Sequence, residues 1–317
     1  MLLARLLLLA ALVLVLVLGD VPESTRFWNA LFDAGHAPLF GVIALVIRSL
    51  LVRSRGDGLA RRASLAAFAV TFVVAVASEA IQRVQPHRDV SVADFLRDIA
   101  GAGAFLLLAE AWRSRHAPGR LFQSRGSRAV AALAAAALLA AAAGEVALTS
   151  ARYVARNRSL PALYALDGSW WERDFIATGR NALTPGRAPA DPGAGAAATL
   201  ARLDLEPGLY SGITFDEPYP DWRGYDRLAF TIVSSLEQPI ELVIRVHDAS
   251  HDQRLADRFN RTLVIAPGAN RIAIPINDIR RAPDRREMDL QRVRGIILFV
   301  YRLNRPVRLS LGPITLE

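Results

Sequence analysis

Five apolar runs in the first 150 residues constrain the fold more than any other feature of the chain. They cover approximately Leu2–Leu18, Ala37–Val52, Ser64–Ile81, Val92–Trp112 and Ala129–Leu148. A helix needs about 17–25 mostly apolar residues to cross the hydrocarbon core of a bilayer. A soluble fold does not easily explain five such segments in so short a stretch. We therefore expect a membrane α-helical bundle of four to five transmembrane helices, followed by a second domain.

Arginines concentrate in alternate loops between these runs. The second and fourth loops contain Arg48, Arg53, Arg55, Arg61, Arg62, Arg113, Arg115, Arg120, Arg125 and Arg128, with Asp57 as their single acid. Loops rich in Lys and Arg stay in the cytoplasm. We therefore expect a multi-pass protein of the bacterial inner (cytoplasmic) membrane, with a cytoplasmic N-terminus and an extracytoplasmic C-terminal domain. Arg152, Arg156 and Arg158 oppose this orientation, but they are outnumbered.

The first run has a second interpretation, a cleaved signal peptide. Arg5 and the apolar core that follows it fit that class of segment. Val17-Leu18-Gly19-Asp20 is a poor small-x-small cleavage site, so we favour a retained helix.

Composition excludes several classes of site. The chain has no cysteine, which excludes disulfides, thiolate metal sites and a cysteine nucleophile. Its net charge of +8 is the difference between 38 basic residues, all of them arginine, and 30 acidic residues. These arginines flank apolar runs and do not form a stripe interleaved with aromatic residues, so we expect no nucleic-acid partner. The lipid bilayer is the expected partner.

Polar residues gather at the ends of the helices that this orientation places outside. They are His36, Glu79, Gln82, Arg88, Asp94 and Asp98. Charged groups near a bilayer are costly unless they pair or line a wet cavity, so we expect a polar cluster in which Glu79 and Asp94 face Arg88. Contact with headgroups and water is the simpler alternative. Gly101 and Gly103 should let another helix approach the fourth helix closely.

The same residues resemble the signature of VanZ-like membrane proteins. Ser78-Glu79-Ala80-Ile81-Gln82, Pro86-His87-Arg88, Ser91, Asp94, Asp98 and Gly101 are similar in order, and His36 with Phe40 is similar to the start of that family's second helix. Asp98 departs from the usual Asn. The resemblance covers residues 1–115 and implies a role in the cell envelope, linked to glycopeptide (teicoplanin) resistance or to envelope maintenance. It does not imply catalysis.

The second half of the chain changes to short alternating segments. Leu228–Val233, Ile240–His247, Arg261–Ile265, Arg271–Pro275, Gly295–Tyr301 and Val307–Leu311 are typical of half-buried strands. We expect residues 116–150 to form a cytoplasmic loop and the fifth helix, 151–165 a tether, and 166–317 an all-β jelly-roll sandwich.

This half resembles the galactose-binding-like jelly rolls of carbohydrate-binding modules. The resemblance rests on Trp222-Arg223-Gly224-Tyr225-Asp226-Arg227-Leu228, Arg245-Val246-His247-Asp248 and Arg258-Phe259-Asn260, and it implies binding of a cell-wall or surface glycan. Flat aromatic faces and convergent polar groups suit sugars. The candidates are Trp170, Trp171, Arg245, Asp248, Arg258 and Asn260; Tyr219 and Tyr301 are further stacking candidates, and Trp222 and Tyr225 are assigned to the core. Trp170 and Trp171 are adjacent, so on a strand one of them would face outward.

Two functions follow from these features. The favoured one is a non-enzymatic envelope protein that displays a glycan-binding sandwich. The alternative is a membrane-embedded enzyme or lipid-handling protein acting on a headgroup or lipid-linked precursor through Glu79, Arg88 and Asp94. We assign no catalytic residue, no cofactor and no metal site. A structural Ca²⁺ fits folds of this kind, but the sequence does not single out its ligands.

Overall fold

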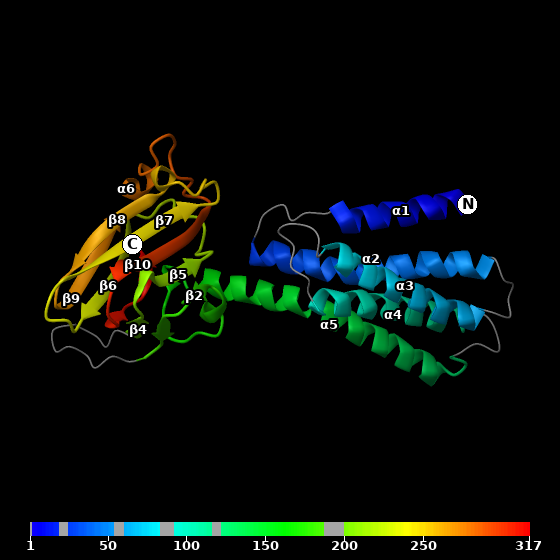
Figure 1. Ribbon diagram of the computed structural model, residues 1–317. Coiled ribbons are helices and arrows are strands. Elements are labelled where there is room, and N and C mark those ends of the chain that lie inside the picture. Colours follow the sequence, from blue (N-terminus) through cyan, green and yellow to red (C-terminus); the bar gives the residue numbers. More distant parts are fainter. Residues whose placement is uncertain (1, 19–24, 54–59, 83–91, 116–121, 187–199) are drawn as a thin grey trace. The chain divides into compact units, whose positions relative to one another are not determined.

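A computed structural model describes residues 2–18, 25–53, 60–82, 92–115, 122–186 and 200–317. The chain divides into two compact units, Met1–Ser150 and Ala151–Glu317. The first is helical and the second is built mainly of strands (Figure 1).

Each of the five apolar runs is helical, as expected. The helices are α1 (Leu2–Leu18), α2 (Arg26–Arg53), α3 (Ala60–Gln82), α4 (Val92–Arg113) and α5 (Arg125–Arg158). Within the described residues, three helices contain stretches long and apolar enough to cross a membrane: Arg26–Val52, Arg62–Ile81 and Arg125–Arg158. Thr25 begins α2 as its N-cap, because its hydroxyl accepts a hydrogen bond from the amide of Trp28 at 3.1 Å.

Helices α2 and α4 run parallel and pack closely. His36 contacts Asp98, and twelve residues later on both helices Arg48 contacts Glu110. A side chain at Gly101 would place its Cβ 1.9 Å from the carbonyl oxygen of Ala37, so glycine is required there. Gly103 has no such neighbour, since a Cβ there would be 3.8 Å from the nearest atoms. The expectation of close approach is confirmed for Gly101 and is wrong for Gly103.

The residues expected to form a tether, 151–165, contain the last turns of α5 and the strand β1 (Ala162–Tyr164). Helix α5 continues to Arg158, because the chain keeps helix-forming residues after the apolar run ends. The ring of Tyr153 packs against that of Phe175 at 5.4 Å, and Arg156 donates a hydrogen bond of 2.7 Å to the carbonyl oxygen of Glu217. These last turns of α5 are therefore part of the second unit.

The second unit is the expected all-β sandwich. Its strands are β1 (Ala162–Tyr164), β2 (Ile176–Ala177), β3 (Ala182–Thr184), β4 (Ala201–Leu205), β5 (Gly208–Asp216), β6 (Arg227–Ser234), β7 (Ile240–Asp248), β8 (Phe259–Ile265), β9 (Gly268–Pro275), β10 (Val293–Leu303), β11 (Val307–Leu311) and β12 (Ile314–Leu316). A short helix, α6 (Ile276–Arg280), follows β9. The six expected strands are all present, and β1 to β5 and β12 are additional.

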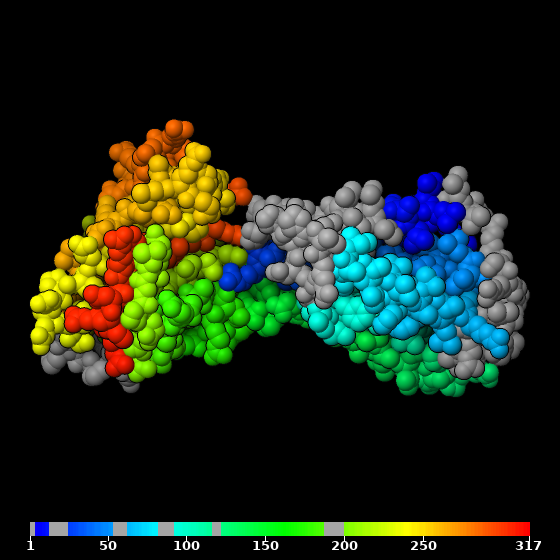
Figure 2. All heavy atoms as spheres, viewed as in Figure 1, coloured from blue at the N-terminus to red at the C-terminus, as the bar shows by residue number. Residues whose placement is uncertain are grey.

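The strands form two antiparallel sheets. A seven-stranded sheet has the order β1-β12-β6-β11-β4-β3, with β9 on the other side of β6, and a five-stranded sheet has the order β2-β5-β10-β7-β8. Figure 2 shows the red C-terminal residues packed among other residues of this unit. In the larger sheet Thr315 of β12 pairs with Ala229 of β6.

Both sheets bury their inward side chains in one core. Leu203 and Ile232 come from the larger sheet, and Phe215 and Leu298 come from the smaller one. Trp222 is fully buried among them, as expected. Burial of each such side chain stabilises the fold by about 1.5–3 kcal/mol compared with leaving it exposed to water. This rigid core leaves the outer face of the five-stranded sheet available for a site.

Candidate ligand-binding groove

The outer face of the five-stranded sheet carries a groove of about 410 Å³. It is lined by Tyr210, Gly212, Thr214, Arg245, Arg258, Ile297 and Phe299. Strand alternation explains why these side chains meet. On β5, Ile213 and Phe215 point into the core, so Tyr210, Gly212 and Thr214 point outward.

The register of the three central strands places the lining residues in rows. Ile297 on β10 lies opposite Thr214 on β5 and Arg245 on β7. Phe299 lies opposite Gly212 in the next row. A Cβ at Gly212 would come within 2.0 Å of the carbonyl oxygen of Leu298, so this point of the groove floor excludes a side chain.

Three aromatic rings form a cluster at one end of the outer face. The ring centroid of Tyr210 lies 5.6 Å from that of Phe299 and 5.3 Å from that of Tyr301. Tyr210 is 68% exposed and Tyr301 is 47% exposed, values that are high for large aromatic residues in a sandwich. Tyr301 was a candidate for stacking, whereas Tyr210 and Phe299 were missed. The outward position of Tyr210 on an alternating strand was the signal that could have found it.

Two arginines supply the charge of the groove. Arg245 projects from β7, and Arg258 immediately precedes β8. Burial, followed by the charge of Arg258, lowers the pKa of Arg245 below its ordinary value, and burial lowers that of Arg258. His247 lies one row along the same face, beside Gly295. Burial and the nearby Arg245 lower the pKa of His247 to about 4, so this imidazole is neutral at pH 7.

The other sequence-predicted glycan residues do not line this groove. Asn260 lies beside Arg245 in register on β8 and is exposed. Trp170 is 56% exposed and Trp171 is 4% exposed, and both lie in a turn, not on a strand. The expected reason for one of them facing outward is therefore wrong. Trp171 packs against Tyr164 in the core and is not a stacking platform.

Asp248 is also not a glycan contact. It is the last residue of β7 and points inward, where its side chain is fully buried. Its carboxylate accepts hydrogen bonds from both terminal nitrogens of Arg286 and from the amide of Asp289. Arg286 also binds Asp257 at 2.6 and 2.9 Å. The two carboxylates and the guanidinium are therefore a structural clamp.

The ion pair between Arg286 and Asp257 lies within a candidate metal site. His251, Asp252 and Asp257 have potential ligand atoms within 4.8 Å of one another. Both carboxylate oxygens of Asp257 are bonded to Arg286, and these hydrogen bonds lower the pKa of Asp257 far below its usual range. A cation would have to displace that guanidinium, so the donor set does not fit a structural Ca²⁺.

In the helical unit, part of the expected polar cluster is brought together. The Nδ1 atom of His36 lies 2.9 Å from a carboxylate oxygen of the fully buried Asp98. Glu79 and Asp94 lie near enough to interact electrostatically with Asp98. Asp94 is bonded to Arg97, a residue not expected in the cluster. Arg88 lies outside the described residues, as does the side chain of Gln82, the last residue of α3.

A second buried pair lies at the opposite end of α2 and α4. Arg48 is 5% exposed and binds Glu110 at 2.6 Å, and the hydroxyl of Ser64 contacts both side chains. Arg48, counted above among the loop arginines, therefore lies inside the helical unit beside Glu110. Buried ionic groups persist only with such partners.

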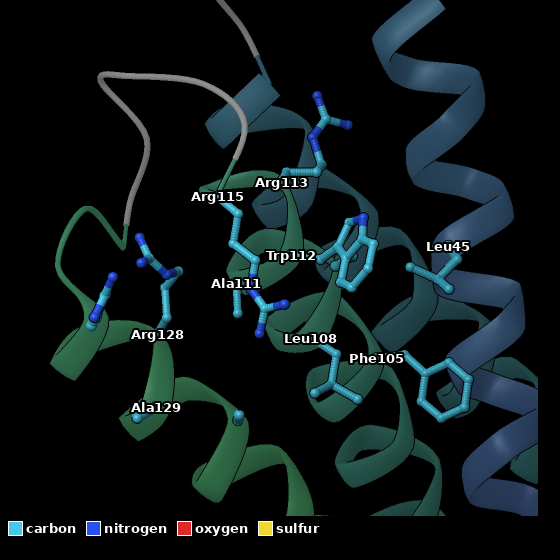
Figure 3. A pocket seen from close by; sticks show the side chains of 12 residues that line it. Leu45, Phe105, Leu108, Ala111, Trp112, Arg113, Arg115, Arg128 and Ala129 are labelled. Atoms are coloured by element: carbon cyan, nitrogen blue, oxygen red, sulfur yellow. The ribbon is translucent and has the colours of Figure 1, made fainter.

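The helical unit also contains a hollow of about 770 Å³ between α4 and α5 (Figure 3). Leu45, Phe105, Leu108 and Ala129 contribute apolar walls. Figure 3 shows Arg115, in the turn after α4, and Arg128 from α5 facing the space between the two helices. Arg113 and Arg125 also line this hollow, and the guanidinium of Arg115 lies 5.3 Å from the ring centroid of Trp112.

Comparison with known proteins shows only distant likeness. No protein-family model matches the sequence, and no curated protein matches it. The family 11 carbohydrate-binding module of Clostridium thermocellum, solved with a β-1,3-1,4-mixed-linked tetrasaccharide, is 15% identical, with a TM-score of 0.33; the match covers 45% of this chain and 85% of the module.

Two further solved structures are similar to a comparable degree. A family 30 module of a Clostridium thermocellum cellulase is 15% identical, covers 45% of this chain and 86% of the module, and has a TM-score of 0.31. An exo-β-agarase is 14% identical with a TM-score of 0.38, over 49% of this chain but only 25% of the agarase. The C-terminal sandwich thus resembles carbohydrate-binding modules, but values this low assign neither a family nor a ligand.

Proposed function

We propose that this protein is a membrane-anchored component of the bacterial cell envelope that binds a polysaccharide in the groove of its five-stranded sheet. One observation carries the proposal: the exposed rings of Tyr210 and Tyr301 lie together on the outer face that also carries Arg245 and Arg258. Pockets that hold small ligands combine apolar or aromatic walls with a few convergent polar groups.

The chemistry of this groove suits a sugar chain. The flat face of a pyranose ring exposes C–H groups that pack against aromatic rings, which bring large, rigid contact area. Arg245 and Arg258 offer several donors in a fixed geometry for hydroxyl or acidic oxygens. The groove lies on the outer face of the sheet, where one stretch of a long chain could bind.

The helical unit supports the membrane part of the proposal. Helices α2, α3 and α5 have the length and hydropathy of spans, and we propose that the apolar runs of α1 and α4 cross the membrane as well. Arginine-rich loops follow α2 and α4. The positive-inside rule then places the N-terminus in the cytoplasm and residues 151–317 outside. The VanZ-like residue pattern agrees with such an envelope protein, and we extend the proposal to envelope maintenance or glycopeptide resistance on that pattern alone.

Binding by the full chain in lipid nanodiscs to a panel of polysaccharides tests the groove. Tyr210→Ala should weaken binding by about tenfold or more, because a contact residue of this kind contributes at least ~1.4 kcal/mol. Trp170→Ala is the matched control, since it removes an exposed aromatic outside the groove. Absence of binding to every polysaccharide, or equal losses from the two substitutions, would overturn the proposal.

Protease accessibility in oriented membrane vesicles tests the topology. A tag after Glu317 should be digested only from the extracytoplasmic side, and a tag before Met1 only from the cytoplasmic side. A C-terminal tag digested from the cytoplasmic side would contradict the orientation.

The pair formed by His36 and Asp98 favours a second candidate, a membrane-embedded enzyme or lipid-handling protein. A histidine bonded to a buried carboxylate, with Glu79 and Asp94 close by, has the components of general acid–base catalysis. Asp98→Asn keeps the shape of the side chain. Loss of the envelope phenotype at normal protein abundance would favour this function, and loss of abundance would favour a structural role.

A further inference from the structure

The groove arginines differ from many other arginines of the sandwich in their surroundings. Many of the others lie beside a carboxylate: Arg202 and Arg308 with Asp204, Arg223 with Asp221, Arg254 with Asp252, Arg261 with Asp278, Arg271 with Glu317, Arg286 with Asp248, and Arg294 with Glu217. Within the described part of the chain, neither Arg245 nor Arg258 forms an ion pair.

Their hydrogen bonding is also incomplete. The Nε atoms of both Arg245 and Arg258 are buried and have no hydrogen-bond partner among the described residues. Arg245 has a long hydrogen bond of 3.5 Å to the side chain of Gln253. A buried donor without an acceptor destabilises the fold, and more so when it is charged. An acceptor supplied from outside would remove that cost.

The two cations also act on each other. The charge of Arg258 disfavours the charged form of Arg245, and none of the described residues that line the groove carries a carboxylate. An anionic group placed between them would be bound by charge-assisted hydrogen bonds, which are roughly twice as strong as those to neutral hydroxyls. Guanidinium groups match carboxylate, sulfate and phosphate oxygens in geometry.

We propose that the groove selects an acidic polysaccharide, whose ring-borne anionic groups bind Arg245 and Arg258 while its sugar rings pack against Tyr210 and Phe299. This inference rests on the proposed function and names its substrate class. Uronic-acid carboxylates and sulfate esters share the required chemistry. A neutral glucan or agarose would leave the two guanidinium groups without a counter-charge.

The test compares polysaccharides that differ only in charge. The full chain in nanodiscs is titrated with polygalacturonate and with its methyl ester, which has the same backbone but no carboxylate. Chondroitin and chondroitin sulfate form a second pair, which separates carboxylate from sulfate recognition. We expect at least one acidic polymer to bind at least tenfold more tightly than the methyl ester.

Substitutions locate the selectivity. Arg245→Gln and Arg258→Gln should each weaken binding of the acidic polymer by about tenfold and leave binding of the neutral polymer unchanged. Arg227→Gln, at the exposed start of β6 in the other sheet, removes the same charge and should have no effect. Arg245→Lys keeps the charge and should retain the preference even if the Gln variants fold poorly.

The outcomes separate the two proposals. Equal affinity for the acidic polymer and its methyl ester would overturn the charge selection and leave glycan binding intact. Binding to no polysaccharide at all would overturn both. An equal loss for Arg227→Gln would show that overall charge, and not the groove, attracts the polymer.

A second and independent observation concerns the hollow between α4 and α5. Arg115, Arg125 and Arg128 line it and form no ion pair within the described residues, while Leu108 and Phe105 form an apolar wall. If α4 and α5 span the bilayer as proposed, this arginine-rich end lies at the cytoplasmic headgroup level. From this charge complementarity we infer that the hollow binds an anionic phospholipid, with the phosphate at the arginines and an acyl chain along the apolar wall.

Native mass spectrometry of the full chain tests this site. Detergent-solubilised protein is mixed with phosphatidylglycerol or phosphatidylcholine, which differ in headgroup charge. We expect preferential retention of phosphatidylglycerol, reduced severalfold by combined Arg115→Gln and Arg128→Gln. Arg62→Gln, an exposed position at the start of α3, is the control and should change nothing. Equal retention of the two lipids, or no effect of the double variant, would overturn the inference.

Discussion

Removal of the Arg286 guanidinium should destabilise the sandwich strongly. This side chain bonds Asp248 and Asp257, and the Asp248 carboxylate is fully buried. Arg286→Met would keep the aliphatic stem and leave a buried carboxylate without its counter-charge. Breaking a buried pair in this way costs about 3–5 kcal/mol. Arg286 is 28% exposed, so the lower end, about 3 kcal/mol, applies.

This loss of stability should be measurable as a lower melting temperature. For a unit of this size, 1 kcal/mol changes the melting temperature by about 2–4 °C, so Arg286→Met should lower the Tm of residues 151–317 by about 6–12 °C at pH 7. Circular dichroism melts measure it. Arg285→Met removes the same charge from an exposed neighbour and should shift the Tm by no more than about 2 °C.

The pH dependence supplies an internal check. Burial raises the pKa of Asp248, but the hydrogen bonds from Arg286 and from the amides of Asp289 and Ser250, together with the charge of Arg286, lower it by more. Hydrogen bonds from Arg286 also depress the pKa of Asp257. Groups with depressed pKa values stabilise the fold above their unfolded pKa, near 4, and lose that contribution as the pH falls below it. The difference between wild type and Arg286→Met should therefore shrink at pH 3. Equal Tm values for Arg286→Met and Arg285→Met at pH 7 would refute the reasoning.

Two further predictions concern other parts of the chain. Gly101→Leu should prevent the close packing of α2 on α4, because its Cβ would overlap the carbonyl group of Ala37, whereas Gly103→Ala should be tolerated. The yield and thermal stability of the two detergent-solubilised variants test this prediction. Equal stability of the two variants would contradict it. An NMR titration should give His247 a pKa of about 4. Because the unfolded chain binds this proton near pH 6.5, the sandwich should lose stability as the pH falls from about 6.5 towards 4. An ordinary pKa for His247 would contradict the explanation by burial.

Hydropathy alone predicted the helical elements, because long apolar runs leave few alternatives. It did not predict the end of α5, since that helix continues beyond its apolar part and packs against the sandwich through Tyr153. Nor did it predict that Arg48 is buried. The partner of Arg48 is Glu110, 62 residues away on another helix, and no local pattern encodes that pairing.

The candidate site was only partly predictable. Arg245 and Arg258 were identified, and the register of β7 and its neighbours brings them to one groove. Strand β5 was missed because Gly208, Ser211 and Gly212 interrupt its β-forming pattern, and with it Tyr210 was missed. Asp248 was a candidate for contact with a glycan, but the alternation along β7 directs its side chain inward beside Arg286.

The most direct test of binding in the groove is an NMR titration of residues 151–317 with an oligosaccharide from a polymer that binds. We expect the largest changes in backbone amide chemical shift at Tyr210, Gly212 and Thr214 on β5 and around Arg245 on β7. Shifts that instead concentrate around Trp170, with the outer face of the five-stranded sheet unchanged, would contradict it.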